Sequence, residues 1–222
     1  MTPIQMPLDM TDPLAPAIAA LRADLIADGG PRVSTMRNHP FAILPYPPEQ
    51  EFPLRRAVQR LASELRSAGW VVLSLDVQQL LLDRVAKAEG GFREATIASE
   101  RRQFSRSPER ALQHLCDRLT SLVEGPDGLA ADVIQHINKF ADEHPERAGR
   151  AVVFLGRVGA LYPFARSSAL LKHVGGHTRG IPVIVLYPGK QVGAADGRRE
   201  SKALSFMGIL PPDRDYRPRI YP

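Results

Sequence analysis

Apolar residues follow two alternating patterns along the chain. Continuous apolar runs, typical of strands covered on both faces of a parallel sheet, lie at 41–46, 70–75, 151–155 and 181–187. Around them, apolar residues recur every three to four positions, which predicts helices at about 13–28, 54–65, 77–88, 108–123, 133–140 and 165–174. The alternation predicts an α/β fold, a Rossmann-like, mostly parallel sheet of four or five strands with helices on both faces.

Short motifs predict where several of these elements begin and end. Asp12 followed by Pro13 combines an N-cap acceptor with a proline at the first helical position, so the first helix is predicted to start there. Residues 1–12 are then a flexible tail, and residues 13–222 are a single domain. Asp76 follows the second strand directly, where we expect it to cap the next helix; the alternative is a magnesium-binding acid.

The segment between the second and third strands is predicted to be a helical insertion at about 90–148. Its first part, 89–107, is polar and rich in arginine, which predicts one helix with loops around it. The helices on either side of the turn at 125–128 are expected to form an antiparallel pair. Further along, residues 189–202 contain little to bury and are predicted to form a mobile loop.

Composition places the chain among ordinary globular proteins. Of its 222 residues, 44% are hydrophobic and 24% charged, and neither an apolar run of membrane-spanning length nor a secretory signal is evident. The single cysteine, Cys116, follows an apolar stripe and is predicted to be a small buried side chain rather than a nucleophile. One cysteine fits a reducing compartment, so we expect a cytoplasmic protein that does not contact a membrane.

The chain carries a net charge of +5, which leaves contact with nucleic acid open. Four arginines gather in the insertion: Arg101, Arg102, Arg106 and Arg110. On one helix these positions would share a face only in part, and Ser107-Pro108 interrupts that helix. Because acids are scattered among the arginines elsewhere in the chain, a solvated surface explains the basic balance equally well.

The residue patterns of catalysis and cofactor binding are not found in the sequence. The nearest string to a phosphate-binding loop, at 188–193, has misplaced glycines, and Gln191 stands where a hydroxyl should bind magnesium. His173 and His177 are separated by two glycines that break the helix needed to align them on a zinc ion. We therefore expect no cofactor, no metal site, no catalytic residues and no enzymatic activity.

Cationic residues do follow the third and fourth strands. Arg157, Arg166 and Lys190 lie near the carboxyl ends of these strands or in the turns leaving them, together with Tyr162. Three cations there could hold an anion, since the backbone N–H groups of the next helix point the same way. The alternative is that they pair with Asp213, Asp215 or the acids of a partner protein.

Several strings in this part of the chain resemble the BrxB family of bacteriophage exclusion (BREX) systems. An apolar strand runs into Gly159-Ala-Leu-Tyr-Pro-Phe-Ala-Arg166, a later strand ends in Tyr-Pro-Gly, and an apolar run near the C-terminus leads to Tyr216-Arg217. The resemblance covers 151–222 well and 41–88 loosely. It implies an accessory protein of antiviral defence that works beside PglZ, a methyltransferase and a large ATPase, without catalytic residues.

The favoured hypothesis is therefore a protein-binding module that docks onto PglZ through protein–protein interaction. Arg157, Tyr162, Arg166, Lys190, Tyr216 and Arg217 are its predicted partner- or anion-binding residues, since tyrosine and arginine dominate interface hot spots. Two alternatives stay open. The protein could contact nucleic acid in the defence complex, or it could be a degenerate anion- or nucleotide-binding domain without turnover.

Overall fold

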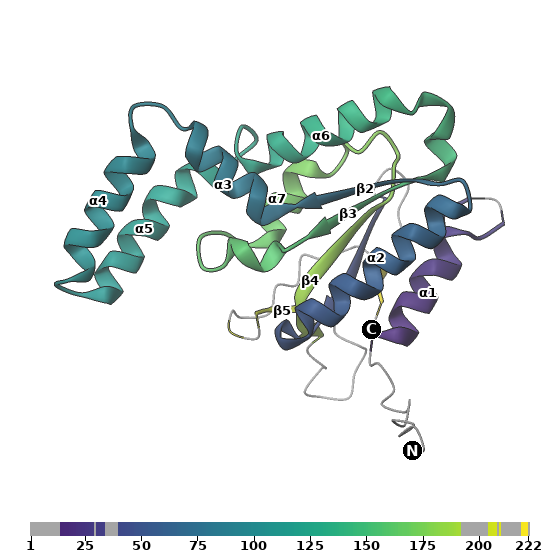
Figure 1. Ribbon diagram of the computed structural model, residues 1–222, viewed down its shortest axis with the longest axis horizontal. Helices are drawn as coiled ribbons and strands as arrows, with labels where there is room; N and C mark the ends of the chain where they lie inside the picture. Colours follow the sequence, from purple (N-terminus) through teal and green to yellow (C-terminus); the bar gives the residue numbers. More distant parts are fainter. Residues whose placement is uncertain are drawn as a thin grey trace, which may run out of the picture.

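A six-stranded sheet forms the centre of the computed structural model, which describes residues 14–28, 30–33, 40–191, 204–207, 209 and 219–221 (Figure 1). The strands are β1 (Phe41–Tyr46), β2 (Val71–Asp76), β3 (Ala151–Gly156), β4 (Val183–Gln191), β5 (Leu204–Phe206) and β6 (Arg219–Ile220). Their order is β2-β3-β4-β1-β6 with every neighbouring pair parallel, and β5 is antiparallel to the end of β4. The predicted α/β class is confirmed.

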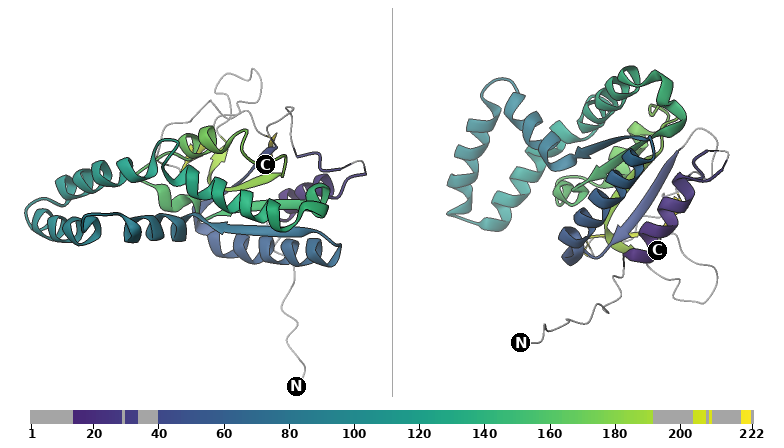
Figure 2. Two further views of the ribbon diagram at one scale, coloured as in Figure 1. Left: turned by 90° about the horizontal axis from the view of Figure 1, so that it is seen from above. Right: turned by 45° about the vertical axis from the view of Figure 1, so that its right-hand side comes forward.

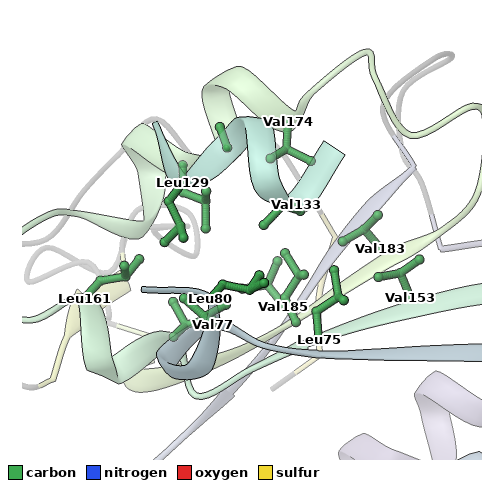
Figure 3. Close-up of a cluster of buried hydrophobic side chains, with 14 of the residues drawn as sticks. Leu75, Val77, Leu80, Leu129, Val133, Val153, Leu161, Val174, Val183 and Val185 are labelled. Carbon is green, nitrogen blue, oxygen red and sulfur yellow. The ribbon is translucent and has the colours of Figure 1, made fainter. Parts of the chain in front are cut away.

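Helices cover both faces of the sheet, as predicted. Alternate residues of each central strand face opposite ways: Phe41 and Ile43 join one core cluster, and Ala42 and Leu44 join the other. The face of Ala42 packs against α1 (Ala15–Leu25) and α2 (Glu51–Ser67), and the opposite face against α3 (Val77–Lys87), α6 (Leu129–Glu143) and α7 (Ser167–Val174). Figure 3 shows the second cluster, where side chains of β3, β4, α3 and α6 converge.

The described connections include the short 3-10 helices η1 (Pro48–Gln50), η2 (Pro145–Arg150) and η3 (Val158–Leu161). The edge strand β6 fixes α1 through side chains, because Arg219 pairs with Asp24 at 2.7 Å and the Tyr221 hydroxyl donates to the same carboxylate at 2.8 Å. Burial and this hydrogen bond raise the pKa of Tyr221 above its usual range. Within the described ranges no helix has the length and apolarity to cross a membrane.

Two element boundaries differ from the sequence prediction. The first helix begins at Ala15, and the predicted start at Asp12-Pro13 lies outside the described residues, as does the predicted tail at 1–12. The predicted loop at 189–202 begins too early, because β4 continues through Gln191 and pairs with β5; residues 192–202 are outside the described ranges. Gly189 permits this pairing, since a Cβ there would lie 1.9 Å from the carbonyl oxygen of Ser205.

The predicted helix pair of the insertion is wrong in its partners. The antiparallel hairpin consists of α4 (Phe92–Phe104) and α5 (Pro108–Val123), whereas α6 lies on the sheet. The apolar stripe of α6 is buried against the strands through Val133, Ile137 and Phe140, so it is not available to α5. The α4–α5 hairpin instead extends as an arm away from the sheet (Figure 2).

Candidate functional site

The carboxyl edge of the sheet holds an ion pair between two strand ends. Asp76 caps α3, accepting a hydrogen bond from the backbone N–H of Gln79 at 3.0 Å, which confirms the predicted cap. The guanidinium of Arg157, just after β3, lies 3.8 Å from the other Asp76 oxygen. Both side chains are about two-fifths exposed, 39% and 42%, so the pair contributes little to stability.

The other predicted edge residues are placed separately around Arg157. Tyr162 is half-buried against the core, Arg166 is exposed immediately before α7, and Lys190 is exposed near the end of β4. Within the described residues, no hydrogen bond or ion pair joins any two of the four. Tyr216 and Arg217 lie outside the described ranges, as do Asp213 and Asp215.

A tyrosine–carboxylate pair that the sequence reading missed lies at the same edge. Tyr46, buried at the end of β1, donates its hydroxyl hydrogen to Glu51 at the start of α2. Burial, this hydrogen bond and the charge of Glu51 raise the pKa of Tyr46 above its usual range, and the positive charge of Arg157 opposes the rise. The positive charge of Arg157 thus acts on both pairs of this edge: it lies 3.8 Å from the Asp76 carboxylate and close enough to Tyr46 to affect the pKa of its hydroxyl.

The second candidate site is the α4–α5 hairpin, which contains a polar contact between its two helices. Buried Thr96 donates to the Phe92 carbonyl at 2.6 Å and accepts from the Arg118 guanidinium at 2.9 Å. That guanidinium also lies 4.7 Å from the centre of the Phe92 ring, a cation–π contact. Ser107 caps α5, followed by Pro108 at its first position, and the two fix the tip between the helices.

Large apolar side chains lie exposed on both helices of this hairpin. Ile97 and Phe104 are two helical turns apart on α4 and are 46% and 60% exposed, and Leu112 on α5 is 47% exposed. Burial raises the pKa of the Cys116 thiol, and the nearby Asp117 and Glu100 carboxylates add to the rise. Ile97 and Phe104 share one side of α4 because they are seven residues apart, and Leu112 is exposed in the first half of the neighbouring α5. We call Ile97, Phe104 and Leu112 the apolar face.

Four arginines surround the tip of the same hairpin. Arg101 and Arg102 belong to the last turn of α4, Arg106 to the connection and Arg110 to the first turn of α5, and all four are exposed. None of their side chains has an ion pair or a hydrogen bond within the part of the chain that the structure describes. The turn at Ser107, which interrupts the helix, thus brings together arginines that one helix would separate. We call these residues the arginine tip.

Comparison with models of protein families identifies the family of this chain. The family model of the BREX protein BrxB matches residues 73–220. The chain belongs to the BrxB family. This membership makes it a component of a BREX antiviral defence system. Neither a curated protein nor a solved structure matches the chain.

The BrxB match runs from β2 to β6 and includes the whole insertion between β2 and β3. The match covers nearly all of the segment 151–222 where the resemblance is strong, and it includes residues 73–88 of the segment 41–88 where the resemblance is loose. The α4–α5 hairpin is part of the matched segment, whereas α1, β1 and α2 precede it. The hairpin is thus a feature of the BrxB part of this chain.

The hairpin of this BrxB protein is attached to the body through Arg84 of α3. Its guanidinium donates to the carbonyl of Leu122 at 2.6 Å and to the carbonyl of Asp127, and pairs with Asp132 at 2.8 Å. These groups lie at the end of α5 and the start of α6, so one side chain joins three elements. The hydroxyl of Thr120 adds a contact of 3.0 Å to the Phe164 carbonyl.

Replacing Arg84 by leucine is expected to lower the free energy of unfolding by about 2 kcal/mol, because two carbonyls and a partly buried carboxylate lose their donor. Urea denaturation measures this change. The matched control is Arg22→Leu, which removes an ion pair with Glu64 that is about half exposed and should cost less than about 0.5 kcal/mol. Equal losses in the two variants would show that Arg84 is not an anchor.

Proposed function

We propose that this protein is a non-catalytic docking component of its BREX system and that its partner is PglZ. The observation that carries the proposal is the α4–α5 hairpin, which stands away from the sheet and exposes the apolar face. Exposed apolar side chains on a projecting element are typical of protein-binding surfaces. Arginines around an aromatic side chain are the residue types enriched at such interfaces.

The residues at the carboxyl edge of the sheet support a role in protein binding better than a role in catalysis. Asp76, the acid most suggestive of a magnesium ligand, serves as a helix cap, and Arg157 forms an exposed ion pair with the same carboxylate. Hairpins that project from a rigid body present their side chains at low cost in conformational entropy, because the helices are ordered before binding. BrxB membership supplies the setting, since the other BREX proteins are the available partners.

The test is co-expression with PglZ from the same operon, followed by size-exclusion chromatography at moderate salt. The proposal expects the two proteins to elute together in one complex, and two separate peaks would contradict it. Arg157, Tyr162, Arg166, Lys190, Tyr216 and Arg217 remain a predicted second contact set for a partner or an anion. Nucleic acid is the alternative occupant of the arginine tip.

A further inference from the structure

We infer that the hairpin binds an acidic surface of a partner protein. This surface has an apolar pocket that receives Phe104 and carboxylates around the rim of the pocket. The inference rests on the proposed docking function and adds the chemistry of the partner. It also assigns roles within the hairpin. The apolar face supplies the buried contact, and the arginine tip supplies the charge pairing around it.

The arginine tip is not neutralised by the acids next to it. The carboxylate of Glu109 accepts a hydrogen bond from Ser107 at 3.0 Å, and that of Asp117 accepts one from Gln113 at 2.9 Å. One oxygen of Glu100 is buried without a hydrogen-bond partner among the described residues. Glu94 pairs with Arg93. Among the described residues, none of these acids forms an ion pair with the four arginines of the tip, whose guanidinium groups face solvent.

Exposed guanidinium groups without an internal partner can pair with carboxylates or phosphates. Each presents a planar fork of N–H donors that matches a carboxylate in two parallel hydrogen bonds. The arginines belong to the end of α4, the connection and the start of α5, so they lie at the same end of the hairpin as Phe104. An apolar anchor beside a group of arginines fits a partner that reverses this pattern, with carboxylates around an apolar pocket.

Duplex nucleic acid fits the same surface less well. Phosphates would pair with the arginines, but the apolar face would then lie against a charged, hydrated backbone and bury little. The exposed side chains of Ile97, Phe104 and Leu112 thus distinguish the two partners. They gain free energy of binding against an apolar protein surface, because apolar area is removed from water there.

The experiment measures association of the full-length chain with purified PglZ across a range of salt concentrations. The test variant is Arg102→Glu with Arg106→Glu. The control is Arg56→Glu with Arg60→Glu, which makes the same change of net charge on exposed α2 positions away from the hairpin. We expect the test variant to associate about 10-fold more slowly than wild type at about 50 mM salt, with a weaker salt dependence, and the control to differ far less.

The outcomes separate the acidic partner surface from the docking function itself. Equal association rates for the test variant and wild type would overturn the acidic partner while leaving docking intact. Failure of the wild-type chain to bind PglZ would overturn the proposed function itself. A short DNA duplex is measured in parallel. One further result would make the arginine tip a nucleic-acid site instead: the duplex binds the wild-type chain with a steep salt dependence and fails to bind the test variant, while PglZ binds both equally well. Circular dichroism and an unchanged melting temperature confirm that both variants are folded.

Discussion

Replacing Phe104 by aspartate is expected to weaken binding to PglZ by about 100-fold or more, corresponding to about 2.8 kcal/mol of binding free energy. Phe104 is the largest side chain of the apolar face and is 60% exposed in the isolated chain. In the complex its ring should fill a pocket, and a carboxylate there would be buried among carboxylates. Isothermal titration calorimetry measures the change in affinity.

The matched control for this prediction is Phe52→Asp. Phe52 lies on α2, is 69% exposed and belongs to neither core cluster, so its replacement adds the same charge at a similarly exposed aromatic position. We expect near wild-type affinity for this variant. If both variants bind PglZ equally well, or both lose binding equally, the apolar face is not the contact.

Replacing Phe154 by alanine is expected to lower the free energy of unfolding by about 3–5 kcal/mol. Phe154 lies in β3 and is 1% exposed, packed in the cluster formed with α1 and α2. Truncating its ring leaves a cavity that these helices can fill only in part. Chemical denaturation measures the loss, which is a large share of the stability of a domain.

Phe52→Ala is the control for the core, and it should change the free energy of unfolding by less than about 0.5 kcal/mol because its ring already faces water. A small loss in the Phe154 variant would mean that α1 and α2 do not pack on this face of the sheet. The arrangement of helices on both faces would then need revision. The hairpin lies outside this cluster, so the result does not bear on docking.

The sequence predicts the central strands well because parallel strands buried on both faces have no polar side. The runs at 41–46 and 151–155 correspond to β1 and β3 almost residue for residue. Strand order could not be predicted, since it depends on which apolar faces meet after the chain folds. The extension of β4 through Gly189 was also missed, because it depends on pairing with β5.

The hairpin could be predicted only in part. Leu112 continues the apolar stripe of α5, which predicts burial, but α5 extends beyond the body at its N-terminal end and leaves this residue exposed. Ile97 and Phe104, seven residues apart in a polar segment, were a usable signal of an exposed face. The sequence did not predict that Arg101, Arg102, Arg106 and Arg110 lie at one end of a hairpin, because their placement depends on the turn between two helices.

Hydrogen–deuterium exchange of the chain, alone and bound to PglZ, tests the central claim most directly. The claim is that this BrxB protein binds its partner through the α4–α5 hairpin. It predicts that backbone amides of α4 and α5 exchange more slowly in the complex, most strongly around the tip, with little change in α1 and α2. Slower exchange confined to the sheet or to α1 and α2, with the hairpin unchanged, would contradict it.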